Sequence, residues 1–173
     1  YIGVSPSLTM HNNVIAGNRS TNSGYGGGFH DNDTGDDDNF SIKYNSFVKD
    51  TSLDKGAAMV LTSNPSNPVQ YNLFYKNVIQ SSSTTGPISN TVYISNNTSP
   101  IINYNNIIDN SASYFIYNEN NYSGNSLDAE NNYWGTTSDS EIQSQLYDGN
   151  DDNSLDFVDY DPYAAALHTD API

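Results

Sequence analysis

The chain has 173 residues, a length that allows one domain with a substantial core, and its 20 acidic and 5 basic residues give a net charge of −15. This charge argues against nucleic acid as a partner, since nucleic-acid binding needs a basic surface, and it disfavours anionic membrane surfaces. Asn, Ser, Asp, Thr, Gly and Tyr dominate and Cys is absent, so strands and turns are favoured over helices and a disulfide framework is excluded.

Five short segments share one pattern, in which an Asn is followed by one variable residue and then by two large apolar or aromatic residues. The anchors of this pattern are Asn12, Asn45, Asn72, Asn105 and Asn131, which recur after 33, 27, 33 and 26 residues. After each of the first four segments comes a second apolar patch, at 27–29, 56–61, 91–94 and 114–117. Such a period indicates a solenoid, because a single coil of short strands cannot bury its apolar face alone.

A second polar column supports the alignment of the coils. Asp50, Asn77 and Asn110 each lie five residues after an anchor, and Asn18 lies six residues after the first. Stacked Asn side chains can bond to one another and to turn backbone, so we expect an asparagine ladder. We therefore predict an all-β fold, a right-handed parallel β-helix whose coils occupy residues 1–137.

The column directly before the anchors consists of His11, Tyr44, Tyr71, Tyr104 and Glu130. Facing outward, its three tyrosines would form a strip that could hold sugar rings. Because side chains alternate between the two faces of a strand, this column should face the same side as the apolar residue two positions earlier. Unless a bend intervenes, the alternation predicts that the tyrosines are core residues.

With its apolar-x-x-Asn-x-apolar-apolar pattern and the Gly-apolar strand that follows, the chain resembles the right-handed parallel β-helix families of surface and carbohydrate-active proteins over roughly residues 8–165. The Asn-Asn-Tyr-Trp-Gly run at 131–135 is similar to the closing segment of surface β-helices. The resemblance implies an extracellular or cell-surface location. It does not choose a function, because this fold hosts lyases, hydrolases, adhesins and spacers.

Residues 138–173 are expected to form a C-terminal cap and tail. Ser138 to Glu141 have the spacing of a capping box, Ile142 and Leu146 share one face of a short helix, and Gly149 could end it. Such a plug would cover the open edge of the last coil. No equivalent plug precedes Leu8, so we expect the N-terminal edge to adjoin further coils of a longer chain or a neighbouring domain.

Two acidic clusters are candidate calcium sites, because Ca²⁺ takes six to eight oxygen ligands from such loops. The first contains Asp31, Asp33, Asp36, Asp37 and Asp38. The second places Asp148, Asn150, Asp152 and Asp159 at positions 1, 3, 5 and 12 of an EF-type loop. The alternatives are a solvated acidic loop for the first cluster and an exposed turn for the second.

Candidate catalytic bases are few. Some β-helix polysaccharide lyases pair Ca²⁺ with a Lys or Arg base, and Lys49 and Lys76 occupy the same repeat position here, four residues after an anchor, with Asp109 next in the column. A surface ion pair between coils is the favoured explanation of this column, because no acidic cluster is next to these lysines in the sequence.

The sequence leads to two hypotheses. The first is a non-catalytic β-helix module of a secreted or cell-surface protein, a spacer, adhesin or glycan-contacting unit stabilised by Ca²⁺, with a polysaccharide or surface glycan as partner and without membrane insertion. The alternative is the C-terminal part of a calcium-dependent polysaccharide lyase or a related carbohydrate-active enzyme.

Overall fold

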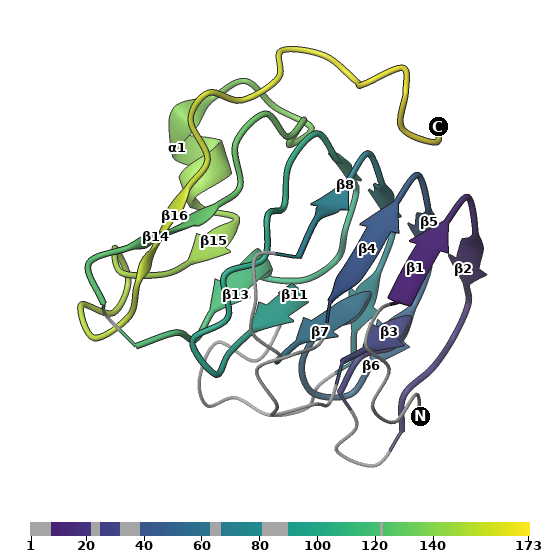
Figure 1. Ribbon diagram of the computed structural model, residues 1–173, viewed down its shortest axis with the longest axis horizontal. Helices are drawn as coiled ribbons and strands as arrows, with labels where there is room; N and C mark the ends of the chain where they lie inside the picture. The colour runs from purple at the N-terminus through teal and green to yellow at the C-terminus, as the bar shows by residue number, and fades with distance from the viewer. Residues whose placement is uncertain (1–7, 22–24, 32–38, 63–66, 81–89, 122) are drawn as a thin grey trace.

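The computed structural model describes residues 8–21, 25–31, 39–62, 67–80, 90–121 and 123–173. It confirms the predicted parallel β-helix: short strands of successive coils stack in a solenoid of about four turns (Figure 1). Every pair of named strands is parallel. Parallel pairing between distant segments is expected for a repeat of this kind, since the strands of each coil form hydrogen bonds only with those of the neighbouring coils.

Three sheets run along the solenoid. The first contains β1 (Leu8–His11), β4 (Phe40–Lys43) and β8 (Val69–Gln70). The second contains β2 (Val14–Ala16), β5 (Ser46–Val48), β9 (Leu73–Tyr75) and β12 (Asn106–Ile108). The third contains β3 (Phe29–His30), β7 (Met59–Leu61), β11 (Asn90–Ile94), β13 (Tyr114–Asn118) and β15 (Leu146–Tyr147).

Two shorter pairs complete the strands. They are β6 (Thr51–Ser52) with β10 (Val78–Ile79), and β14 (Ser126–Asp128) with β16 (Phe157–Asp159). Isolated parallel bridges carry the pattern one coil further, for example between Asn106 and Tyr133.

The core lies between the sheets and is built from columns of like residues. Ile15, Phe47, Phe74 and Ile107 are in register on the second sheet, and the rings of Phe47 and Phe74 stack with centroids 5.2 Å apart. Trp134 closes this stack at the C-terminal end, where its ring meets that of Phe115 edge-on at 5.7 Å. Coil stacking thus produces the continuous apolar interior that one coil could not supply.

The first asparagine ladder is confirmed, with a correction at both ends. Its five rungs are Asn13, Asn45, Asn72, Asn105 and Asn132. In each step the Oδ1 of one rung accepts bonds of 2.8–3.1 Å from the backbone N–H and the Nδ2 of the rung before. The predicted anchors at 12 and 131 were therefore wrong by one residue, because each begins an Asn-Asn pair and the second Asn is the rung.

The second ladder contains Asn18, Asp50, Asn77 and Asn110, as the sequence predicts. Its bonds of 2.9–3.1 Å repeat the geometry of the first ladder. With Asn13 as the first anchor, all four residues lie five positions after a rung.

A left-handed backbone residue precedes each rung of the first ladder. Tyr44, Tyr71 and Tyr104 have φ of 58°, 56° and 60°, and Asn12 and Asn131 share this conformation. Left-handed φ is uncommon for residues other than Gly, and here it makes a corner between two strands. The corner breaks the strand alternation, so the tyrosines are half-buried on the outside and the prediction that they are core residues was wrong.

The cap begins with the only helix among the described residues, α1 (Asp139–Gln143), which buries Ile142. The capping-box prediction was wrong, because Ser138 makes no side-chain cap bond and the Glu141 carboxylate instead accepts from the hydroxyl of Thr136. Gly149 does not end the helix either, since Ser144 is its C-cap and β15 follows.

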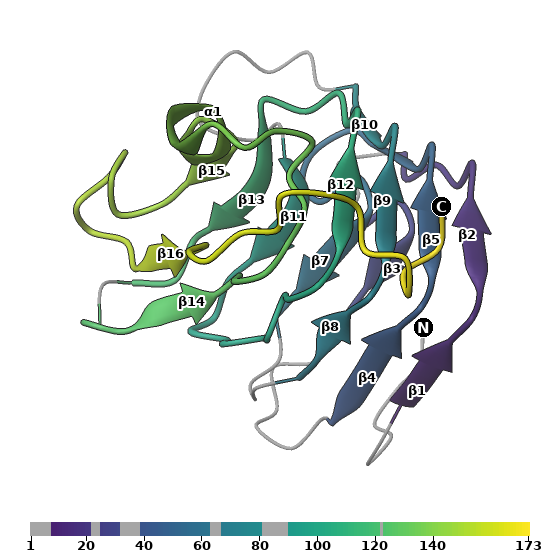
Figure 2. The ribbon, with the colours of Figure 1, turned by 90° about the horizontal axis from the view of Figure 1, so that it is seen from above.

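Residues 160–173, which we call the tail, run back across the solenoid from the cap toward the earlier coils (Figure 2). Backbone bonds join the tail to the last rung region, from the N–H of Asn131 to the carbonyl of Pro162 and from the N–H of Ala164 to that of Asn132. Ala171, near the end of the tail, is buried. Within the described residues, no helix has the length and apolar character needed to cross a bilayer.

Candidate functional site

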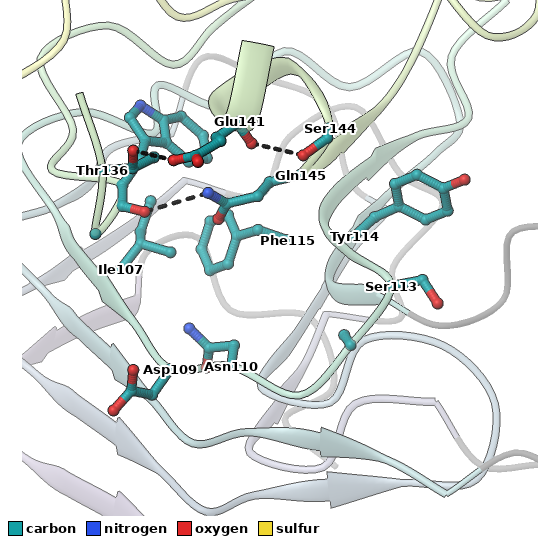
Figure 3. A pocket seen from close by; sticks show the side chains of 13 residues that line it. Ile107, Asp109, Asn110, Ser113, Tyr114, Phe115, Thr136, Glu141, Ser144 and Gln145 are labelled. Carbon is teal, nitrogen blue, oxygen red and sulfur yellow. Dashed lines mark hydrogen bonds between the residues drawn. The ribbon is translucent and has the colours of Figure 1, made fainter. Parts of the chain in front are cut away.

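A pocket of about 350 Å³ lies where the solenoid meets its cap (Figure 3). Its walls come from three stretches of chain: 107–115 in the coil of Asn105, 134–136 after the last rung, and 141–145 in α1 and the turn beyond it. The pocket forms because the chain leaves the repeat after Trp134, so the last coil has no neighbour along this part of its edge.

The second ladder ends at this pocket. In earlier coils, the backbone N–H of each ladder residue donates to the Oδ1 of the next, as Asn77 does to Asn110 at 3.1 Å. Asn110 has no next rung: among the described residues nothing accepts from its backbone N–H or from that of Asp109. The Nδ2 of Asn110 still donates to the carbonyl of Phe74 at 3.0 Å, which fixes the side chain. Two backbone donors of the ladder are therefore available at the pocket wall.

The other side of the pocket is polar and held in place. Figure 3 shows Asp109 and Asn110 on one side and Glu141 and Gln145 on the other, with the ring of Phe115 between them. The Nε2 of Gln145 donates to the carbonyl of Trp134 at 3.2 Å, and Glu141 is held by Thr136. Amides and carboxylates beside aromatic rings can bind a ligand that has both hydroxyl groups and apolar faces.

This pocket was not predicted from the sequence. Its lining residues Asp109, Asn110, Trp134 and Glu141 belong to other sequence patterns, whereas Gln145, Ser113 and Thr136 belong to none. Their common location depends on the direction in which the chain turns at Gly135, where φ is 76°.

The outward tyrosine column is a stack of rings. Tyr44 and Tyr71 have ring centroids 5.2 Å apart with an interplanar angle of 10°, and Tyr71 and Tyr104 have the same spacing with an angle of 12°. His11 meets one end of the stack edge-on, and His168 of the tail meets the other. Because the ring faces cover one another, the column presents ring edges and hydroxyl groups, and it is not the flat stacking platform for sugars that an outward strip suggested.

Lys49, Lys76 and Asp109 do form a column. Each precedes a residue of the second ladder, each has a left-handed φ of 51–57°, and each is exposed. The ammonium group of Lys76 lies 4.7 Å from the centroid of the Tyr75 ring. Asp109 reaches the pocket and neither lysine lines it, so a role for Lys49 or Lys76 as a catalytic base stays a prediction.

The first acidic cluster lies mostly outside the described residues, which include Asp31 but not Asp33, Asp36, Asp37 or Asp38. Asp31 is half-buried, and its backbone carbonyl accepts from the Thr62 hydroxyl at 2.6 Å. Beside it, burial lowers the pKa of His30 while the charge of Asp31 opposes the shift.

The structure separates the four residues of the second cluster by environment. Asp148 is fully buried, and its Oδ1 and Oδ2 accept from the backbone N–H groups of Asn150 and Val158 at 2.9 Å each. Asp152 accepts from the N–H and hydroxyl of Ser154, while Asn150 and Asp159 are exposed. In the part of the chain that the structure describes, no three His, Asp or Glu side chains gather as a metal site. Calcium at either cluster therefore stays a prediction.

Comparison with protein-family models, curated proteins and solved structures finds no match to this chain.

Proposed function

We propose that this chain is a non-catalytic β-helix module of a secreted or cell-surface protein that contacts a glycan in the pocket beside Trp134. The observation that carries the proposal is the pocket itself, which combines fixed polar groups with aromatic side chains at the capped end of the solenoid. The extracellular location follows from the resemblance of the repeat to surface β-helices.

The size and lining of the pocket suit a sugar. Small-molecule sites occupy about 300–1,000 Å³, so a volume of about 350 Å³ is enough for one or two sugar rings. A sugar hydroxyl can accept from the free N–H groups at Asp109 and Asn110 and donate to the Asp109 or Glu141 carboxylate. Phe115 and Trp134 line the pocket but are almost fully buried, so the half-buried Tyr114 supplies the ring against which the C–H face of a sugar can pack.

The charge of the pocket selects among glycans. Two carboxylates, from Asp109 and Glu141, line it, and no Lys or Arg is among its lining residues. An anionic sugar such as a uronate would be repelled by these like charges. We therefore expect a neutral glycan to bind in preference to a polyuronate.

Trp134 offers a direct measurement, since it is the only tryptophan in the chain and lines the pocket. Neutral and uronate oligosaccharides are titrated while tryptophan fluorescence is recorded. The proposal expects a saturable change with neutral sugars, weakened at least about tenfold in Gln145→Ala, which corresponds to about 1.4 kcal/mol. Gln143→Ala is the matched control, because Gln143 ends α1 two residues before Gln145 and does not line the pocket.

Two outcomes would overturn the proposal. One is the absence of any saturable response across a panel of neutral glycans. The other is the formation of unsaturated product from a uronate polymer, abolished in Lys49→Ala or Lys76→Ala, which would establish the lyase alternative in its place.

A further inference from the structure

Asp50 occupies a position in the second ladder where the other three residues are Asn. Its side chain is fully buried. Its Oδ1 accepts from the backbone N–H and the Nδ2 of Asn18, both at 2.9 Å, and its own backbone N–H donates to Oδ1 of Asn77 at 3.0 Å. Asp50 therefore replaces an asparagine as an acceptor without disturbing the register of the ladder.

The second carboxylate oxygen of Asp50, Oδ2, cannot replace the Nδ2 donor that an asparagine has at this place. Oδ2 is buried and has no hydrogen-bond partner among the described residues. At the next rung, Nδ2 of Asn77 donates to the carbonyl of Phe47 and to Oδ1 of Asn110, both at 3.0 Å. Because the two rungs are in register, Oδ2 of Asp50 takes the place of this donor, and an ionised carboxylate there would face other acceptors.

The surroundings leave little room for another partner. A Cβ added to Gly28 would lie 2.8 Å from Oδ2 of Asp50 and 3.1 Å from the Ile15 side chain, so the Gly28 backbone lies directly against this oxygen. A buried acceptor without a donor costs about 1–3 kcal/mol, and more when it is charged. Protonation removes this cost, because a carboxylic acid has one O–H donor.

We propose that Asp50 is a neutral carboxylic acid in the folded protein, with Oδ2–H as the donor that an asparagine Nδ2 supplies in the other rungs. The ladder then binds one proton, and the solenoid is more stable when that proton is present. This inference is independent of the pocket and of the glycan.

The electrostatics of the site agree with the geometry. Burial raises the pKa of Asp50 above its ordinary value of 3.8, and the bonds from Asn18 oppose the shift only in part. Its ladder neighbours Asn18 and Asn77 and the adjoining Gly28 are uncharged. The charged residues next in sequence to the ladder are all exposed: Arg19, Lys49, Lys76 and Asp109. Since the folded-state pKa is the higher one, the stabilisation is fully present below about pH 3.8 and is lost as pH rises through the raised value.

The test compares the wild-type chain with Asp50→Asn, which restores the Nδ2 donor. At about pH 7 we expect the variant to melt roughly 2–4 °C higher, with the difference narrowing as pH falls toward about 4. Asp109→Asn is the matched control, because it removes one charge at an exposed residue next to the same ladder, and its difference from wild type should not follow this profile. An Asp50→Asn variant that melts no higher than wild type at neutral pH overturns the proposal.

A measurement on the wild-type chain decides the matter even if the variant does not fold. The ¹³C shift of Asp50 Cγ is followed by NMR between about pH 4 and pH 8. The expected midpoint of this titration lies above that of the exposed aspartates, as a carboxyl group that donates within the ladder requires. Titration of Asp50 together with the exposed aspartates would contradict the inference.

Discussion

The side-chain amide of Asn106 pairs with the backbone of His168 as a neighbouring strand would. Its Nδ2 donates to the His168 carbonyl at 3.0 Å, and its Oδ1 accepts from the His168 N–H at 2.9 Å. Asn106 is fully buried. Ser46 and Leu73 are in register with it in the two earlier coils, and neither side chain bonds to the tail among the described residues. The Asn106 amide thus attaches the tail one coil before the backbone bonds that join it to Asn131 and Asn132.

Replacing Asn106 by Ala should loosen the part of the tail around His168. Both bonds to His168 are lost, and we expect the free energy of unfolding to fall by about 1–3 kcal/mol. Hydrogen exchange and limited proteolysis of residues 164–171 measure the loosening directly. Ser46→Ala, at the same place two coils earlier, should leave the tail protected. Equal protection of the tail in Asn106→Ala and wild type would show that the amide does not hold it.

The central rung Asn72 should be the most sensitive position of the first ladder. Asn72→Ala removes the acceptor of the Asn45 backbone N–H and one of the three acceptors of the Asn45 Nδ2. It also removes the Nδ2 that donates to the Ile42 carbonyl and to Asn105. With several buried groups unsatisfied at once, we expect a loss of at least about 3 kcal/mol in urea unfolding. Asn125→Ala, at an exposed turn, is the control and should change stability by less than about 0.5 kcal/mol. A loss of similar size in the two variants would contradict the assignment of the ladder as a stabilising element.

Calcium binding is tested by its effect on melting. If Ca²⁺ occupies either acidic cluster in the folded chain, the melting temperature should fall on adding a chelator and recover with excess Ca²⁺. Asp148→Asn should lower the melting temperature with or without Ca²⁺, because the Asp148 carboxylate organises the turn before β16 through Asn150 and Val158. A melting temperature that does not change on adding chelator would contradict calcium binding at either cluster.

Alkaline pH should loosen the junction between tail and cap. Burial, together with the hydrogen bond to Asp139 and the charge of that carboxylate, raises the pKa of Tyr160 to about 12. A raised folded-state pKa means that the stabilisation is fully present below about pH 10 and is lost as pH rises toward 12. Ultraviolet titration should therefore show a late-ionising tyrosine that is missing in Tyr160→Phe and that ionises earlier in Asp139→Asn. An unchanged late phase in Tyr160→Phe would assign it to another tyrosine.

Much of the solenoid could be predicted because its ladder residues are followed by apolar pairs at every coil. Asn45 and Asn72 have no adjacent asparagine, and the pattern identifies them correctly; Asn105 is also identified correctly, because in its Asn-Asn pair the first residue is the rung. At 12–13 and 131–132 two adjacent asparagines satisfy the pattern almost equally well, and only the backbone hydrogen bonds distinguish the rung from its neighbour.

The tyrosine column shows where the periodicity was not sufficient. Alternation assumes continuous extended backbone, and the left-handed corner at Tyr71 turns the side chain to the opposite side. The location of the pocket could not be predicted, because Asn110 and Gln145 are brought together only by the path that the chain takes through the cap. That path depends on tertiary packing, which has no local sequence period.

The returning tail also has a mechanical consequence. It contacts the last rung region at Asn132 and the preceding coil at Asn106, and the charge of Asp170 acts on Tyr71 one coil earlier still. In a solenoid each coil otherwise contacts only its neighbours, so tension at one end would strip coils one after another. Tension on the C-terminus must first peel the tail away from several coils at once, so in force spectroscopy the earliest rupture should be that of the tail, ahead of any coil.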